Sequence, residues 1–166
     1  MVATPSSNVA NKALGGLARR LVADEILSEV KALEIQEAAL KQRVAFVTHL
    51  VSADVVPALR VAEAASREFG VPLFDLRALN IGQAPVRDVS ENLIRKHHAL
   101  PLFKRGNRLY VGLSDPTNFA ALDEIKFNTG MSTEAILVEE DKLSKSIEDA
   151  LAATDTTLAG LDDADL

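Results

Sequence analysis

The sequence predicts an α+β protein, in which a small N-terminal helical bundle of two helix-pair repeats precedes an α-ββαβα subdomain. Residues 12–70 are rich in Ala, Leu and Glu, with apolar residues at helical spacing. Further along, a turn signal at Gly106-Asn107 separates two short runs with strand character. A third strand-like run, residues 135–138, follows a helical segment, and a right-handed crossover would set it parallel to one hairpin strand.

Composition narrows the class of protein. The chain has 166 residues, of which 48% are hydrophobic and only 4% aromatic, so its core must be aliphatic. The net charge is −6, but four aspartates lie within 154–166 and the rest of the chain is nearly neutral, which argues against strong attraction to nucleic acid or anionic lipid. Cysteine is absent, and no apolar run approaches the roughly 18–20 residues that span a bilayer. These features favour a cytoplasmic protein without direct membrane insertion.

The two ends of the chain differ in character from the middle. Residues 1–11 are small and polar, and we expect them to be disordered. Residues 154–166 read as an acidic linker, because three leucines cannot bury enough surface to offset the entropy of ordering. Between the ends, the composition suggests a helical repeat subdomain at 12–70, a connector at 71–89 and an α/β subdomain at 90–153.

The helical subdomain contains an internal repeat, in which the segment from Leu17 aligns with the segment from Phe46. Each unit reads as a short amphipathic helix, a bend and a longer helix, and two such pairs can bury their apolar faces against each other. Chance alignment of apolar residues in Ala- and Leu-rich helices is the alternative. The first longer helix starts after Ser28, an N-cap residue, and carries Val30, Leu33, Ile35 and Leu40. The alignment places Leu17, Leu21, Val22, Glu25, Ile26 and Leu27 on Phe46, Leu50, Val51, Asp54, Val55 and Val56.

The second longer helix begins near Pro57 and stops at Gly70. The connector holds Pro and Gly without a helical stripe, with a short strand near Leu73-Phe74. The α/β subdomain then follows as a series of short elements. We expect a helix from Ser90 to about His98, followed by strands at 101–104 and 108–113. The next helix is capped by Asp115 and carries Phe119, Leu122, Ile125 and Phe127. A strand at 135–138 and a helix at 141–152 complete the subdomain.

A cluster of basic residues lies around the predicted hairpin, and a phosphate or nucleic-acid site would need such charge. Solvated charges at a hairpin tip are the interpretation we favour, and a phosphate-binding site is the alternative. The cluster includes two adjacent histidines, His97 and His98. Adjacent side chains on a helix point about 100° apart, so these two cannot readily share a metal ion. The cluster comprises Arg95, Lys96, His97, His98, Lys104, Arg105 and Arg108.

No motif in the sequence indicates catalysis. There is no GxxxxGK[ST] phosphate-binding loop, no GxSxG and no cysteine nucleophile. Asp115 is better explained as a helix cap and Asp123 as an exposed helical residue. We therefore predict no catalytic residues, no metal site and no cofactor.

Residues 97–130 resemble the N-terminal domain of the type II secretion and type IV pilus assembly ATPases. The family pattern has a Pro-Leu strand, a Gly-Asn turn, an Asp-Pro-x-Asn helix start and a Thr-Gly helix end, and the chain matches it in order and spacing. The segment from Phe69 to Leu76 matches the link between the two halves. The resemblance implies a regulatory domain whose full-length protein is a hexameric ATPase.

The resemblance also allows the helical half to be compared with the ligand-binding motif of some family members. Some family members bind cyclic di-GMP through Arg-Leu-Gly and Gly-Leu-Ile in each repeat. Here these positions hold Gly16-Leu17-Ala18 and Glu25-Ile26-Leu27, then Ala45-Phe46-Val47 and Asp54-Val55-Val56. Both arginines and all four glycines are missing, although Arg19, Arg20 or Arg43 could substitute after a shift of register.

We therefore expect a protein-docking domain that binds a PilZ-type adaptor and controls pilus extension at the inner face of the cytoplasmic membrane. The alternatives are a cyclic di-GMP receptor domain and a docking domain for an inner-membrane secretion or pilus platform protein. An aliphatic helical surface suits a protein partner. The predicted partner-binding residues are Leu17, Leu21, Ile26, Leu27, Phe46, Leu50 and Val55.

Overall fold

The polypeptide divides into two units, residues 1–70 and 71–166. The computed structural model describes the backbone of residues 14–164 and the side chains of residues 14–155. The first unit is helical and the second combines helices with a three-stranded sheet, so the predicted α+β class is confirmed. The segment predicted to be disordered, residues 1–11, lies outside the described part of the chain.

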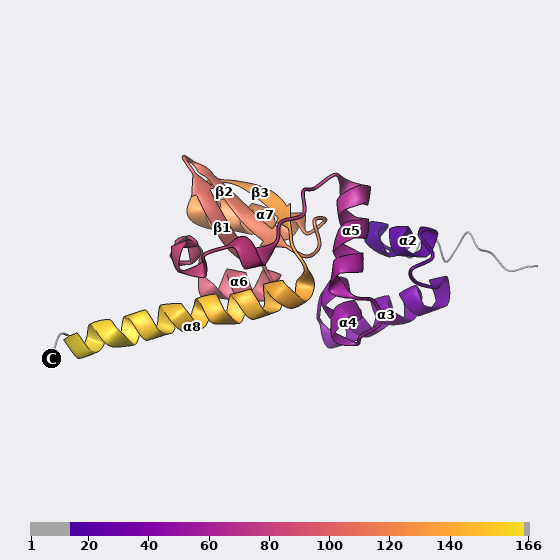
Figure 1. The fold of residues 1–166 in the computed structure, drawn as a ribbon, viewed down its shortest axis with the longest axis horizontal. Coiled ribbons are helices and arrows are strands. Elements are labelled where there is room, and N and C mark those ends of the chain that lie inside the picture. The colour runs from indigo at the N-terminus through magenta and orange to yellow at the C-terminus, as the bar shows by residue number, and fades with distance from the viewer. Residues whose placement is uncertain (1–13, 165–166) are drawn as a thin grey trace, which may run out of the picture. The chain divides into compact units, whose positions relative to one another are not determined.

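The described part of the helical unit, residues 14–70, contains four helices (Figure 1). Helix α2 contacts both α3 and α5, and α3 also contacts α4. Leu21, Leu50 and Val61 are buried at the centre, as expected for two helix pairs that share a core. The helices are α2 (Gly16–Ala23), α3 (Glu29–Gln42), α4 (Phe46–Ser52) and α5 (Ala58–Phe69).

Helix α3 begins where the sequence indicates, because the Ser28 side chain accepts a hydrogen bond from the Lys31 amide at 3.2 Å. Its buried face differs in part from the expected one. Val30 and Leu40 are 77% and 73% exposed, whereas Ile35 is buried as expected, together with the small side chains of Ala32 and Ala39. Small side chains let α3 approach its neighbours closely, and this leaves the larger aliphatic residues at the surface.

The sheet of the second unit has the order β1-β2-β3. Strands β1 (Leu100–Arg105) and β2 (Arg108–Leu113) are antiparallel and joined at Gly106, whose φ is +57°. Helix α7 (Phe119–Thr129) crosses over to β3 (Ser132–Leu137), which lies parallel to β2 as predicted. The third strand starts three residues earlier than the apolar run at 135–138.

The connector is part of the folded unit. Leu73 forms a single β-bridge with Leu137, the last residue of β3, where the sequence predicted a short strand. Three single turns of 3-10 helix follow, and they bury Leu76, Val86 and Val89 against the sheet and helices. These turns are η1 (Leu76–Ala78), η2 (Ile81–Gln83) and η3 (Val86–Asp88).

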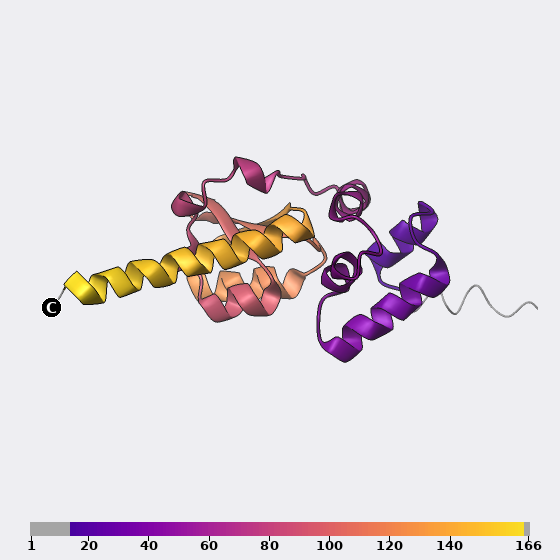
Figure 2. The same cartoon turned by 60° about the horizontal axis from the view of Figure 1, so that its bottom comes forward.

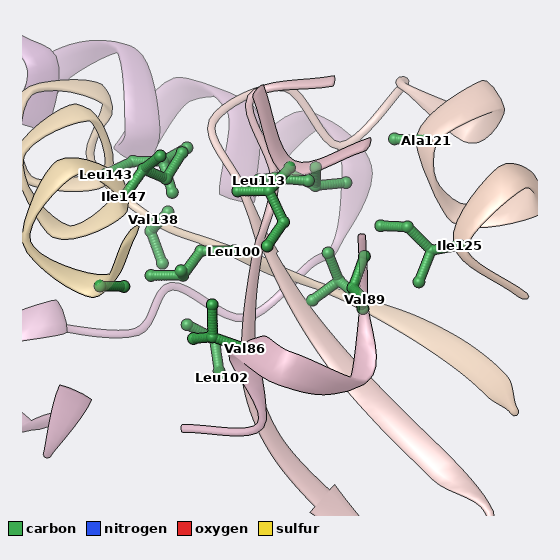
Figure 3. Close-up of a cluster of buried hydrophobic side chains, with 14 of the residues drawn as sticks. Val86, Val89, Leu100, Leu102, Leu113, Ala121, Ile125, Val138, Leu143 and Ile147 are labelled. Atoms are coloured by element: carbon green, nitrogen blue, oxygen red, sulfur yellow. The ribbon is translucent and has the colours of Figure 1, made fainter. Parts of the chain in front are cut away.

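Helices α6 (Glu91–His97), α7 and α8 (Glu140–Ala164) enclose the core of this unit. Figure 3 shows aliphatic side chains from the strands, the connector, α7 and α8 converging on one cluster, to which Ile94 of α6 also belongs. Leu100, Leu113 and Ile125 are at most 1% exposed. The core is therefore aliphatic, as the composition predicted.

The start and buried face of α7 differ from the prediction. Asn118 caps the helix by accepting a hydrogen bond from the Ala121 amide at 3.2 Å, whereas Asp115 accepts one from the Thr117 amide at 2.9 Å in a preceding turn. Phe119 and Phe127 are 66% and 94% exposed. Of the expected residues Ile125 is buried and Leu122 is half-buried, and Ala121 is the other buried side chain of the helix.

Helix α8 runs to Ala164, and the prediction of an acidic linker over 154–166 is wrong for the backbone of residues 154–164. Extending an existing helix adds one hydrogen bond per residue without a new nucleation step, and no proline interrupts this segment. The last turns project beyond the sheet (Figure 2). Among the residues that the structure describes, no helix is long and apolar enough to cross a bilayer.

Candidate functional site

The two helix pairs have the same backbone at their bends. Helix α2 ends at Asp24 with φ −82° and ψ 5°, and α4 ends at Ala53 with φ −84° and ψ 6°. The next residues, Glu25 and Asp54, both adopt left-handed conformations, with φ of 58° and 56°. Because these residues are equivalent in the alignment of the two segments, the repeat that the sequence predicted is a structural duplication.

Main-chain hydrogen bonds hold both bends. The Ile26 amide donates to the Leu21 carbonyl at 3.0 Å, and the Val55 amide donates to the Leu50 carbonyl at 3.2 Å. These bonds join main-chain atoms, so they can form whichever residue occupies the left-handed position.

The left-handed residues are the most informative feature of the helical unit. Left-handed backbone favours glycine, and an L-residue there costs roughly 1–2 kcal/mol. Glu25 and Asp54 occupy the positions where the motif of the cyclic di-GMP binders has glycine. Both side chains are exposed, and neither carboxylate has an ion-pair partner among residues 14–155. At both positions the chain has the left-handed backbone that favours glycine, but it presents negative charge there.

The other two glycine positions are closed in a different way. Ala18 and Val47 are 2% and 1% exposed, so their side chains fill space inside the unit. A ligand cannot reach the backbone at positions that are buried in this manner. All four positions that the motif keeps open for close backbone approach are therefore filled by side chains.

Of the three arginines that could replace the missing ones, Arg20 is already engaged. Its Nε lies 3.0 Å from Asp24 and its Nη1 lies 3.2 Å from Glu68. The carboxylate of Asp24, with a smaller contribution from Glu68, raises the pKa of Arg20. Arg19 and Arg43 are exposed and have no ion pair in the described part of the chain.

The structure separates the predicted partner-binding residues into two groups. Ile26, Phe46 and Val55 are partly exposed and can be contacted by another molecule. The other four have exposed fractions of at most 6%, so they form the core of the unit and cannot meet a partner while it stays folded. These four are Leu17, Leu21, Leu27 and Leu50.

Two exposed aliphatic residues were missed as candidate contacts. Val30 in α3 is 77% exposed and Leu59 in α5 is 46% exposed. Val30 and Leu59 are also equivalent in the alignment of the two repeats. Each repeat therefore presents one partly exposed residue in the bend, Ile26 or Val55, and one exposed residue in the first turn of the longer helix, Val30 or Leu59. We call the residues Ile26, Val30, Val55 and Leu59 the repeat surface. The internal repeat was the signal in the sequence that could have identified them.

Most of the basic cluster of the second unit forms ion pairs. Lys104 Nζ lies 2.9 Å from Asp88, and Arg108 Nη1 lies 2.9 Å from Glu134. Arg95 pairs with carboxylates of α6 and α8, and Lys96 with one of α7. Within residues 14–155, Arg105 is the member of this cluster without such a partner. The cluster is therefore largely neutralised, as expected for charges at a protein surface.

The two histidines contact different carboxylates. His97 Nε2 lies 3.0 Å from Glu124, whose pKa is lowered first by His97 and then by Lys96. His98 Nε2 lies 2.8 Å from Glu140. No group of three or more metal-ligating side chains occurs in the described part of the chain.

Ser144 Oγ approaches His98 Nε2 at 3.0 Å, the same nitrogen that faces Glu140. A catalytic triad needs the acid and the nucleophile on opposite ring nitrogens. Ser144, His98 and Glu140 therefore do not form one.

Comparison with known proteins places the chain in a family. The model of the MshEN domain matches residues 69–157. Type IV pilus assembly ATPase PilB of Pseudomonas aeruginosa is 43% identical over 153 residues, which is 92% of this chain and 27% of that protein. PilB of Acinetobacter baylyi is 36% identical over 134 residues, covering 81% of this chain and 23% of that protein. The chain thus spans about a quarter of the length of these relatives.

Two solved structures share the fold at 20% sequence identity. The N-terminal domain of XpsE has a TM-score of 0.65 and the comparison covers 89% of this chain and 97% of that one. A structure of MshE with cdg has a TM-score of 0.58 and covers 81% of this chain and 97% of that one. Because the family model matches more than half of the residues, the chain belongs to the MshEN domain family.

Proposed function

We propose that this chain is a non-catalytic regulatory domain of a type IV pilus assembly ATPase, and that it binds a PilZ-type adaptor to control pilus extension and twitching motility. The similarity to two PilB proteins supports this assignment. The chain itself contains no phosphate-binding loop. ATP hydrolysis, in a hexameric full-length protein at the inner face of the cytoplasmic membrane, would belong to the remainder of the protein.

The observation that carries the proposal is the pair of left-handed acidic residues. Glu25 and Asp54 place two carboxylates at positions where the motif of the cyclic di-GMP binders has glycine, which lets the backbone approach the ligand. Like charges at close range disfavour that ligand, and the site offers no partner to neutralise them within residues 14–155. The bends keep their shape but have lost the chemistry that suits a small anion, which leaves the surface available for a protein.

The repeat surface suits a protein partner of complementary chemistry. In each repeat one of its aliphatic residues directly follows the acidic residue of the bend, and the other lies in the first turn of the longer helix. A suitable partner would present apolar side chains with lysine or arginine nearby. Its apolar side chains would cover the aliphatic residues of the repeat surface, and its basic side chains would neutralise the two carboxylates. We propose that the adaptor has such a face. An inner-membrane platform protein with the same chemistry is the alternative partner.

The test is isothermal titration calorimetry of the whole chain with a PilZ-type adaptor from the same genome. Val30→Asp and Leu59→Asp place a charge in the apolar contact, and we expect each to weaken binding at least tenfold, about 1.4 kcal/mol. Leu40→Asp is the matched control, because Leu40 is 73% exposed on the same helix as Val30 but has no counterpart in the repeat surface. Unchanged affinity in both folded variants would overturn the assignment.

A cyclic di-GMP receptor is the second candidate, because MshE, which shares this fold, has been solved with cdg. Titration of the chain with cyclic di-GMP separates the two functions. We expect no binding at micromolar ligand concentrations, since four of the positions that the ligand needs are filled by side chains. A dissociation constant in the micromolar range or below would establish the receptor instead.

A further inference from the structure

A distinct group of polar side chains lies on one face of the sheet in the second unit. Residues directly opposite one another on neighbouring strands point to the same face, and the face alternates along each strand. The register therefore defines two adjacent rows of side chains. One row is Arg105, Arg108 and Ser132, and the next is Phe103, Tyr110 and Glu134.

A shallow pocket of about 410 Å³ that is open to the solvent, which we call the cavity, lies among these side chains. Its lining is rich in hydrogen-bond donors, with two guanidinium groups, one amide and two hydroxyls. Tyr110 is held in place because its ring stacks on Phe103 with 4.7 Å between the ring centroids. The lining residues are Arg105, Asn107, Arg108, Tyr110 and Ser132.

The charges of this cavity are not balanced. Arg105 and Arg108 are directly opposite in the β1-β2 pair, an arrangement that is destabilising for like charges. Glu134 neutralises Arg108 at 2.9 Å, while Arg105 has no ion-pair partner among residues 14–155. Two arginines and one glutamate leave the cavity with a single positive charge. The hydroxyls of Tyr110 and Ser132 likewise have no hydrogen-bond partner in the described part of the chain.

We propose that this cavity binds a carboxylate from a protein partner. A carboxylate carries one negative charge, which matches the net charge of the cavity, and it can accept two parallel hydrogen bonds from the guanidinium of Arg105. A phosphate group with close to two charges would leave an excess of negative charge beside Glu134. A nucleic acid would in addition be repelled by a chain of net charge −6. This site is separate from the repeat surface and does not depend on the proposed adaptor.

The carboxylate could come from an Asp or Glu side chain or from the C-terminus of the partner, and small probes distinguish the two. We would titrate the ¹⁵N-labelled whole chain with N-acetylglutamic acid α-amide, N-acetylglycine and inorganic phosphate at low salt, and follow the arginine Nε–Hε signals by NMR. We expect saturable shifts at Arg105 with at least one of the two carboxylates. The probe that binds more tightly identifies the source.

Two variants make the test specific. Arg105→Gln should weaken carboxylate binding by about fivefold, the upper range for an exposed charge pair. Arg60→Gln is the matched control, since Arg60 is also exposed and unpaired within residues 14–155, and it should leave the affinity unchanged. Glu134→Gln should give the cavity a second positive charge and tighten phosphate binding by about fivefold.

Three results would overturn the proposal. The first is the absence of a saturable shift at Arg105 with either carboxylate. The second is an equal loss of affinity in Arg105→Gln and Arg60→Gln. The third is tighter binding of phosphate than of both carboxylates by the unaltered chain, which would assign the cavity to a phosphorylated ligand.

Discussion

Glu25 has a φ of 58°, in the region where a β-carbon crowds the following carbonyl oxygen and glycine does not. The Glu25→Gly exchange removes a conformational cost of roughly 1–2 kcal/mol from the folded state. It also gives the unfolded chain more freedom, which costs about 0.4–1 kcal/mol. We therefore expect the helical unit to become more stable by about 0.5–1 kcal/mol. Asp54→Gly should gain less, because aspartate tolerates the left-handed region better than glutamate.

Ala53→Gly is the matched control, because Ala53 precedes Asp54 and has a φ of −84°. Glycine relieves no strain at this position, and the exchange should destabilise the unit by about 0.5–1 kcal/mol. The opposite signs expected at Asp54 and at the residue that precedes it separate the effect of the backbone conformation from that of glycine itself.

Native-state hydrogen exchange of the whole chain measures these differences. The amides of Ile26 and Val55 are suitable probes, because each donates to the carbonyl of a buried leucine. The free energy of opening at these amides should rise in Glu25→Gly and fall in Ala53→Gly. If it falls in both, the left-handed conformation carries no strain, and the interpretation of the bends as altered glycine sites fails.

Three further predictions concern the second unit. Asn118→Ala removes the cap of α7 and should lower the free energy of unfolding by about 1 kcal/mol in urea denaturation. Ile125→Ala should cost about 2–5 kcal/mol in the same assay, whereas Phe127→Ala should change it by less than about 0.5 kcal/mol, since these residues are 0% and 94% exposed. Hydrogen bonds from Arg77 lower the pKa of Asp75 from 3.8 to about 2, so their stabilising effect is complete above pH 3.8 and lost toward pH 2. Urea denaturation of Asp75→Asn and the unaltered chain should therefore converge at pH 2.

Features that depend on neighbouring residues could be predicted from the sequence. Ser28 and Ser90 cap helices where expected, because a capping side chain bonds an amide in the first turn that follows it. The hairpin at Gly106 and the parallel third strand follow from turn chemistry and from the handedness of crossovers. The two helix pairs were predicted from an internal repeat that the backbone reproduces.

Features that depend on contacts between residues far apart in the sequence could not be predicted from it. The choice between Asp115 and Asn118 as the cap of α7 depends on how the helix packs, and both residue types form caps and turns equally well. The apolar character of Leu21 and Leu50 could not show whether they face a partner or the core, because the same residue types serve both. The left-handed φ of Glu25 could be anticipated only from the resemblance, since glutamate has no preference for that conformation.

The bends of the helical unit have a consequence for how such domains change their ligands. Since main-chain hydrogen bonds close the turn in both repeats, substitutions at its apex can change the charge of the surface while these bonds remain. The backbone of the bend and its preference for a ligand can therefore change independently during evolution, so that related domains with the same bend can differ in the class of molecule they bind.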